Sequence, residues 1–371
     1  MEFVDFKIKE IAKVTAGGDK PKIVSNSYSD ETPIPIYSNG MENDGLYGYT
    51  NIPKVDADTV TISARGVNVG KVCYRETAFL PIVRLLSLIP NRSVINAKYM
   101  YYNLKMMNIS GTGSAQPQIT VPMISELKMH IHKDLIEQEK IASFLSVLDE
   151  KIKNNNRINR NLSEQAKILY KEWFIDFGPF EGEMPGAWHL GTVEEIIELH
   201  DSKRKPLSGR QRDDMEKIYP YYGATSIMDY VDNYIFDGIY LLLGEDGSVI
   251  DTEGYPILQY VFGKFWPNNH AHVITGKNGF SVEMLYLLFS LTNVQNIVTG
   301  AVQLKISQQN LKTVEVVVPS YEAITEFDEM IQPIFREIRR LRTENDKLTT
   351  LRDNLLPKLM SGELDVSDLD I

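Results

Sequence analysis

The chain repeats itself, and this repetition constrains its possible folds more than any other feature. Residues 112–119, Thr-Gly-Ser-Ala-Gln-Pro-Gln-Ile, return as residues 299–306, Thr-Gly-Ala-Val-Gln-Leu-Lys-Ile. A long stretch with heptad spacing follows the first copy, and another closes the chain. We therefore expect two similar heads, each followed by a long helix. Such heads, held a fixed distance apart, suit a ligand that is itself linear and has two parts.

Further matches support the duplication. Lys20-Pro21 corresponds to Lys205-Pro206, Pro35-Ile36-Tyr37 to Pro220-Tyr221-Tyr222, Tyr101 to Tyr286, and Gly66 to Gly244 after a deletion in the second copy. We divide the chain into head 1 (residues 1–133), a spacer helix (134–177), head 2 (178–320) and a second spacer helix with a C-terminal tail (321–371).

Head 1 has the pattern of a mixed α/β domain. The alternation over residues 59–63 predicts a strand, and residues 127–131 predict another that ends the head. Residues 37–40 predict a turn, and the apolar run 98–107 predicts a short helix. Because head 2 repeats these landmarks, we expect the same mixed α/β (α+β) architecture there.

The hydrophobic period changes after residue 136, where apolar residues follow steps of four and three. The first seam comprises Ile141, Leu145, Leu148, Ile152, Leu162, Ala166 and Leu169, with Asn155 and Asn159 at the two intervening positions. This pattern is that of a coiled coil, in which seam asparagines weaken packing but fix register. The helix is expected to run to about Phe174 and stop near Gly178-Pro179.

The second seam keeps the same register. It comprises Phe327, Ile331, Ile334, Ile338, Leu341, Asn345, Leu348, Arg352, Leu355 and Leu359. Pro333 predicts either a kink or a helix that starts near it. Because neither apolar seam is stable in water, we expect the two helices to pack antiparallel as a coiled coil. The alternative, that each helix only caps its own head, remains open.

Composition limits the functional classes. The net charge of −11 argues against nonspecific coating of nucleic acid, although basic residues cluster at 151–160 and 203–205. The single cysteine, Cys73, cannot form an internal disulfide, which fits the reducing cytoplasm. Neither a signal peptide nor a membrane-spanning apolar stretch is recognisable in the sequence. We therefore expect a cytoplasmic protein.

The sequence contains no motif that predicts catalysis. Residues 66–72 have the wrong spacing for a phosphate-binding loop, and Asp149-Glu150-Lys151, a fragment shared with many nucleases, lies on the expected helix. The pairs His130/His132 and His270/His272 lack cysteine or carboxylate partners at metal-ligand spacing. A non-catalytic chain without a metal of its own is the prediction.

The helical segments resemble the repeated regions of type I restriction-modification specificity subunits. The resemblance lies in residues 135–142, 166–177 and 351–363, and the order of head, helix, head, helix matches along the whole chain. It implies that each head docks in a DNA major groove and reads a half-site, while the helices set the gap between half-sites.

The same resemblance implies partners and cofactors. Two methyltransferase subunits would bind the helices and methylate adenine N6 with S-adenosylmethionine, and restriction/translocase subunits would join with ATP and magnesium. The chain itself would carry no cofactor and would bind double-stranded DNA.

Side chains in loops supply the candidates for DNA contact. Arg65 has the chemistry to bind guanine, and Asn39 or Asn68 to bind adenine. The other candidates are Gln116 and Gln118, Gln303 and Lys305 in the repeated loop, Tyr37 and Tyr222 as backbone contacts, and Lys203 and Arg204 in the basic cluster. A turn that seats each head on its helix is an equally open interpretation of the repeated loop.

The two heads differ where base contacts are expected. Matching Gly66 to Gly244 places residues 65–68, Arg-Gly-Val-Asn, opposite residues 243–246, Leu-Gly-Glu-Asp. An acid accepts from cytosine but repels phosphate, so we expect an asymmetric, gapped target. The alternatives are a two-headed adaptor that binds proteins or glycans and, third, a nuclease with a dispersed active site.

Overall fold

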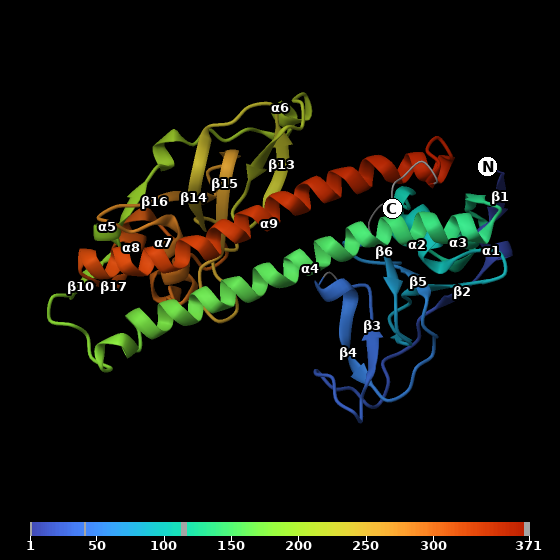
Figure 1. The fold of residues 1–371 in the computed structure, drawn as a ribbon, viewed down its shortest axis with the longest axis horizontal. Coiled ribbons are helices and arrows are strands. Elements are labelled where there is room, and N and C mark those ends of the chain that lie inside the picture. Colours follow the sequence, from blue (N-terminus) through green and yellow to red (C-terminus); the bar gives the residue numbers. More distant parts are fainter. Residues whose placement is uncertain (1, 41, 113–116, 367–371) are drawn as a thin grey trace. The chain divides into compact units, whose positions relative to one another are not determined.

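The computed structural model describes residues 2–40, 42–112 and 117–366, which divide into two compact units. Unit 1 comprises Met1–Asn154 and Asn345–Ile371, and unit 2 comprises Asn155–Glu344. Each unit contains one head and a part of both long helices, α4 (Leu135–Phe174) and α9 (Tyr321–Ser361) (Figure 1). Among the described residues, no helix has the length and apolar content that crossing a membrane requires.

Head 1 combines small sheets with short helices. A pair of antiparallel strands, β1 (Phe3–Lys7) and β9 (Lys128–His132), joins the beginning and end of the head. The four-stranded sheet has the order β2-β8-β5-β6, with β2 at Ala12–Ala16, β8 at Leu86–Pro90, β5 at Thr59–Ile62 and β6 at Val72–Arg75. The three-stranded sheet has the order β4-β3-β7, with β4 at Leu46–Thr50, β3 at Ile34–Tyr37 and β7 at Leu80–Pro81.

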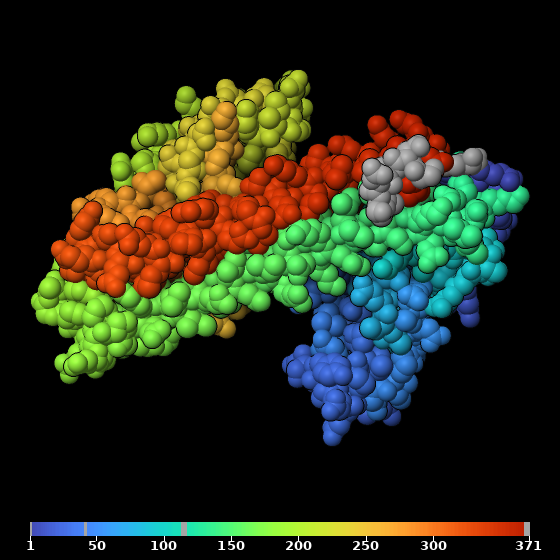
Figure 2. Space-filling view, viewed as in Figure 1, coloured from blue at the N-terminus to red at the C-terminus, as the bar shows by residue number. Residues whose placement is uncertain are grey.

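Four helical segments complete head 1. They are α1 (Ile8–Ile11), the 3-10 turn η1 (Glu42–Gly45), α2 (Ala97–Met106) and α3 (Val121–Glu126). The strands predicted at 59–63 and 127–131 and the helix predicted at 98–107 are confirmed, with ends shifted by one residue. In the space-filling view, the region around β3 and β4 forms a lobe that extends away from the α4 part of unit 1 (Figure 2).

Head 2 repeats this plan with longer strands. β10 (His189–Thr192) and β17 (Glu315–Val318) form the closing pair. The six-stranded sheet has the order β11-β16-β14-β15-β12-β13, with the strands at Ile197–Leu199, Ala271–Gly276, Phe236–Gly244, Leu258–Pro267, Tyr219–Tyr222 and Ile227–Val231. The helical segments are η2 (Gly178–Phe180), α5 (Val193–Ile196), η3 (Asp201–Lys203), α6 (Gly209–Asp213), α7 (Val282–Ser290), η4 (Gln295–Ile297) and α8 (Gln308–Lys312).

The match between Tyr37 and Tyr222 is confirmed by equivalent contacts in the two heads. Tyr37 pairs with Pro81 in parallel β7, and Tyr222 pairs with Pro267 in parallel β15. Each ring also meets a phenylalanine edge-on, with centroids 5.8 Å apart in head 1 and 5.7 Å apart in head 2. The duplication in sequence is therefore a duplication of structure.

The backbone bonds of the repeated loop show how the strand ends of the two heads correspond. Ile119 donates its N–H to the carbonyl of Ala64, and Ile306 donates to the carbonyl of Glu245, each at 3.0 Å. Because Ile119 and Ile306 close the two copies of the loop, Ala64 corresponds to Glu245.

This correspondence corrects the match of Gly66 with Gly244. Gly66 corresponds to Gly247, and both adopt positive φ, 80° and 98°, whereas Gly244 is the last residue of strand β14. Arg65 therefore stands at the position of Asp246. The sequence match fails because β14 is longer than β5, so that a strand glycine in one copy falls near a turn glycine in the other.

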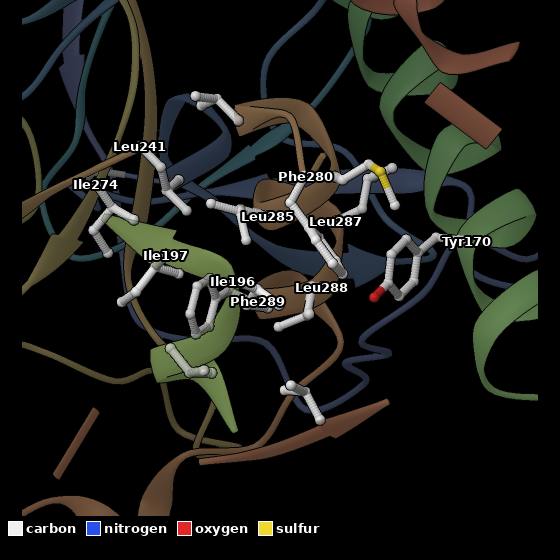
Figure 3. Packing of buried hydrophobic residues seen from close by; sticks show 14 of the residues in the cluster. Tyr170, Ile196, Ile197, Leu241, Ile274, Phe280, Leu285, Leu287, Leu288 and Phe289 are labelled. Carbon is white, nitrogen blue, oxygen red and sulfur yellow. The ribbon is translucent and has the colours of Figure 1, made fainter. Parts of the chain in front are cut away.

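The core of unit 2 joins the head to both long helices. Tyr170 and Phe174 of α4 pack against Phe327 of α9, with ring centroids 5.7 Å and 4.8 Å from that of Phe327. Figure 3 shows Tyr170 beside the side chains of α7, which include Leu287 and Leu288. The helices thus complete the hydrophobic core of the head.

Unit 1 uses the other ends of the same helices. Its core contains Ile141, Ala142 and Leu145 of α4 together with Leu356, Leu359 and Met360 of α9. Since the beginning of α4 meets the end of α9 here, and the reverse holds in unit 2, the helices pack antiparallel within each unit. The predicted coiled coil is confirmed, and the alternative in which each helix only caps its own head is excluded.

Pro333 neither starts nor ends α9. The helix begins at Tyr321, where Ser320 accepts a hydrogen bond from the Ala323 N–H at 3.3 Å, and it continues to Ser361. A helix start near Pro333 is therefore excluded, because burial of residues such as Phe327 on the first turns offsets the backbone bond that proline removes. A kink at Pro333, the other form of the prediction, stays a prediction.

Candidate nucleic-acid interface

The repeated loop is fastened to the sheet in the same way in both heads. Thr112 and Gln118 exchange two backbone hydrogen bonds at 3.0 Å each, and Thr299 and Lys305 exchange theirs at 2.9 and 2.8 Å. Residues 113–116, and with them the candidate Gln116, lie outside the described residues. In each head the described ends of the loop thus pair with each other beside the residue that follows a strand, Ala64 after β5 and Glu245 after β14.

Arg65 lies at the tip of a second turn in head 1. The turn is closed by the Gly70 N–H, which donates to the Ser63 carbonyl at 2.9 Å. Arg65 is half-buried, and no described residue forms a hydrogen bond or ion pair with its guanidinium. The adjoining Val67 is 86% exposed. Arg65 therefore keeps its hydrogen-bond donors available for a ligand at the head's surface.

Asn39 and Asn68 hold this turn in place. Asn39 donates to the Val83 carbonyl at 2.7 Å and accepts from the Ala64 N–H at 2.9 Å. Asn68 donates to the Gly40 carbonyl at 2.9 Å. Both ends of the Asn39 amide are occupied by backbone groups, so in this arrangement its hydrogen bonds support the turn that presents Arg65.

The two equivalent tyrosines pack within their own heads. The Arg75 guanidinium lies 3.7 Å from the Tyr37 ring centroid, and Phe79 meets the ring edge-on. Tyr222 is half-buried against Phe265. Their described contacts therefore make them part of the sheet that supports the surface loops.

The basic cluster of head 2 is split between surface and interior. Lys203 is exposed, whereas the Arg204 side chain is 12% exposed and lies inside the head. Its guanidinium donates to Glu245 at 2.7 Å and to the Ala271 carbonyl at 2.6 Å. Sequence proximity to Lys203 and Lys205 does not reveal this, because an acidic partner forty-one residues away decides it.

Arg204 belongs to a cluster of charges that sequence reasoning missed. His272 Nδ1 lies 2.6 Å from Asp201, and the ligand atoms of Asp201, Glu245 and His272 all lie within 4.8 Å of one another. The cationic groups of Arg204 and Lys305 lie 2.7 Å and 3.4 Å from the Glu245 carboxylate. Because these protein cations already neutralise the carboxylates, the arrangement is an ion-pair network and leaves little negative charge to bind a metal ion.

Burial and charge act in opposite directions on Asp201. Burial would raise the pKa of its carboxyl, but the hydrogen bond from His272, the charges of His272 and Arg204 and the Val273 N–H together hold the pKa below its ordinary value. Asp201 is therefore ionised at neutral pH. The only sequence signal was the pair His270/His272, whose members separate: His272 is buried, while His270 lies 3.6 Å from Asp246.

Head 2 presents its copy of the repeated loop to solvent. Val302 and Gln303 are exposed, and the Lys305 side chain is 48% exposed although its ammonium lies 3.4 Å from Glu245. In head 1 the equivalent of Lys305 is Gln118, which is half-buried. The two loops thus present different chemistry on the same backbone.

Unit 1 also contains a cleft of about 550 Å³ between β6, α2 and α4. Its lysines are balanced by carboxylates: Lys71 pairs with Asp44 at 2.9 Å and Lys98 with Glu150 at 3.9 Å. This balance does not favour a nucleic-acid backbone over other ligands.

A family model described as the type I restriction modification DNA specificity domain matches residues 1–164 and 185–350. These ranges include head 1, nearly all of head 2 and most of both long helices. The chain belongs to this family. Specificity subunits are the DNA-recognition components of type I restriction-modification systems and are not their catalytic components.

Relatives of this family match along most of the chain. The MjaIX specificity subunit of Methanocaldococcus jannaschii is 26% identical over 98% of this chain and 94% of its own length. The HindI specificity subunit of Haemophilus influenzae is 23% identical over 74% of this chain and 79% of its own. The crystal structure of the S subunit from M. genitalium has a TM-score of 0.59 at 18% identity, with 96% of each chain covered. The last likeness shows a shared fold.

Proposed function

We propose that this specificity subunit reads an asymmetric, bipartite DNA target with one half-site per head, and thereby directs adenine methylation and cleavage by partner subunits. Residues 1–133 and 178–320 act as the recognition domains, and residues 134–177 and 321–371 provide the spacer helices. The observation that carries the proposal is that two heads of the same topology present different side chains at equivalent surface positions. Head 1 has Arg65 where head 2 has Asp246, and Gln118 where head 2 has Lys305.

These differences have the chemistry to distinguish bases. An arginine in a major groove binds guanine through its O6 and N7, whereas an aspartate accepts from the cytosine amino group. Arg65 and Asp246 therefore favour different bases in the two half-sites. Gln303 and Lys305 extend the surface of head 2, and Lys203 is placed for phosphate contact. Asn39, Asn68, Tyr37, Tyr222 and Arg204 support these surfaces through the contacts described above.

The long helices hold the partner subunits in this proposal. Large apolar side chains are exposed on α4, with Ile136, Val147 and Ile168 between 59% and 63% exposed, and Leu351 of α9 is 45% exposed. Two methyltransferase subunits with S-adenosylmethionine would cover such positions, and restriction subunits would join with ATP and magnesium. The assembly acts in the cytoplasm, where basic partner surfaces supply phosphate contacts that a chain of net charge −11 lacks.

Mapping of N6-methyladenine across the host genome tests the proposal. The gene is compared in its intact, deleted and restored states. Methylation at one bipartite, gapped motif should vanish on deletion and return on restoration. Unchanged methylation at every motif, in a host that expresses the chain together with its partners, would contradict the proposal and favour a two-headed adaptor.

A further inference from the structure

Head 2 has a buried ionic network where head 1 has apolar side chains. The equivalence follows from the strand register: Ile62 pairs with Leu86 in head 1, and Leu243 pairs with His272 in head 2. His272 therefore occupies the position of Leu86. By the same register, Asp201 occupies the position of Ala16, which pairs with Leu86, and Glu245 that of Ala64.

The network joins three segments that are distant in sequence. Asp201, in η3, accepts from the backbone N–H of Val273 in β16 at 2.8 Å and from His272 at 2.6 Å. The Gln308 amide at the start of α8 also donates to Asp201. His272 donates through its other ring nitrogen to the Ile306 carbonyl at 2.8 Å, at the end of the repeated loop.

Both ring nitrogens of His272 face acceptors, the Asp201 carboxylate on one side and the Ile306 carbonyl on the other. Around this pair, the Arg204 guanidinium lies 3.4 Å from Asp201 and 2.7 Å from Glu245, and Glu245 lies 3.6 Å from His272. The Lys305 ammonium lies 3.4 Å from Glu245 and completes the network at the surface.

The network fastens the two surface loops of head 2 to each other. The Ile306 carbonyl accepts from His272 while the Ile306 N–H donates to the Glu245 carbonyl, and the backbones of Asp246 and Lys305 form an antiparallel β-bridge. Hydrogen bonds between charged, buried groups are directional, so they fix geometry more narrowly than apolar packing does. Removal of one buried hydrogen-bonding side chain leaves its partner without a hydrogen bond, which is costly, so the network is expected to form and to be lost as a unit.

We propose that Asp201 and His272 are positioning residues of the second head: they hold the loop of residues 299–306 against the strand end at Glu245 and Asp246, and so fix which base head 2 accepts. Head 1 positions the equivalent loop by apolar packing around Ile119 and Leu86. The effect on base choice rests on the proposed function, whereas the effect on the loop does not.

Amide hydrogen exchange on the full chain, purified with its partner subunits, tests the positioning role. Asp201→Asn replaces one of the two acceptor oxygens by an NH2 donor, which then opposes either the Val273 N–H or the donors of His272 and Gln308. Exchange at the Lys305 and Ile306 amides, which are both hydrogen-bonded, should rise about tenfold or more, as expected for loss of a charged hydrogen bond. The equivalent amides of Gln118 and Ile119 in head 1 serve as internal controls and should not change.

Two further variants keep the test decisive. Glu283→Gln disturbs another buried ion pair of unit 2, with Arg339 at 2.6 Å, that does not contact the loop, so it should leave exchange at Lys305 and Ile306 unchanged. If Asp201→Asn does not fold, Gln308→Ala removes one bond to Asp201 and should raise exchange by a smaller factor. Unchanged loop exchange in a folded Asp201→Asn or Gln308→Ala protein overturns the proposal.

The methylation spectrum of the same complexes tests the effect on base choice. Asp201→Asn should allow methylation at genomic sites that depart from the wild-type motif in one half only. A loosened loop with an unchanged motif overturns the role in base choice. Absence of any bipartite motif in the wild type would instead reject the proposed function, and the exchange measurement would still decide whether the network positions the loop.

Discussion

At the scale of single residues, the charged side chains that contribute most to the packing are those whose partners lie far away in sequence. Arg352 of α9 donates to Asp149 of α4 at 2.6 Å, and Tyr102 of head 1 donates to the same carboxylate at 2.8 Å. Asp149 of the fragment Asp149-Glu150-Lys151 therefore has a structural role, because its carboxylate joins head 1 to both long helices.

Replacing Arg352 should destabilise unit 1. The side chains of Arg352 and Asp149 are 13% and 26% exposed, so Arg352→Ala leaves a largely buried carboxylate without its cation. The expected loss is about 2 kcal/mol, between the values for surface and fully buried pairs. Arg340→Ala is the matched control, because Arg340 is 58% exposed and solvent screens its ion pairs, so its loss should be clearly smaller. Denaturant unfolding measures the loss of stability in both variants, and equal losses for Arg352→Ala and Arg340→Ala would contradict this prediction.

The two glycines of the Arg65 turn should respond differently to alanine. A Cβ on Gly70 would lie 2.0 Å from the Ile109 carbonyl oxygen at φ +88°, whereas a Cβ on Gly66 at φ +80° meets no atom within 4 Å among the described residues. Gly66→Ala should therefore cost only about 1–2 kcal/mol for the backbone conformation. Gly70→Ala should cost more, because the backbone must also move. Thermal unfolding measures both losses, and a larger loss for Gly66→Ala would be inconsistent with this geometry.

Glu126 should titrate well below an ordinary glutamate. Hydrogen bonds from Lys7 and Lys9 lower its pKa to about 2. Since the folded pKa is depressed from 4.5, the stabilisation it provides is present above pH 4.5 and is lost as the pH falls towards 2. An NMR titration of the Glu126 carboxyl measures the midpoint. In a Lys7→Gln, Lys9→Gln protein it should return towards 4.5, and an unchanged midpoint would argue against the lysines as the cause.

At the scale of elements, each long helix serves two cores. The seam positions were readable from the heptad spacing, and the two seam asparagines are buried as expected, with Asn155 donating to Glu344 at 3.1 Å. The aromatic end of α4 was less predictable. Tyr170, Trp173 and Phe174 surround Phe327, because the head supplies further apolar surface beyond the seam.

Truncating Phe327 should destabilise unit 2 strongly. Its ring is fully buried, and Phe327→Ala is expected to cost about 3–5 kcal/mol through lost burial and the cavity left behind. Met330→Ala, at a position of the same helix that is 38% exposed, should cost less than about 1 kcal/mol. Denaturant unfolding compares the two variants. Similar losses would show that the α9 face is not packed as described.

At the scale of the whole molecule, the two heads should affect different halves of the DNA target. Arg65→Ala should relax base preference in one half-site, with a loss of about 1–3 kcal/mol in discrimination, and Asp246→Ala should relax it in the other. Genome-wide adenine methylation reports both motifs. Relaxation of the same half by both variants would contradict the assignment of one half-site to each head.

The sequence by itself determined the duplication, the two long helices and the family. These features are local or periodic: heptad spacing, helix-ending residues and the repeated loop are written in neighbouring residues. The residues of that loop were visible as a repeat before their partners were known.

Tertiary structure alone decided the roles of the candidate residues. Arg204 is internal because Glu245 and Ala271 accept its hydrogen bonds. The Asn39 amide is occupied because it donates to the Val83 carbonyl and accepts from the Ala64 N–H. The correct partner of Gly66 likewise emerged only from strand register. In each case, the deciding contact joins residues far apart in the chain, and no local pattern specifies which distant group a side chain meets.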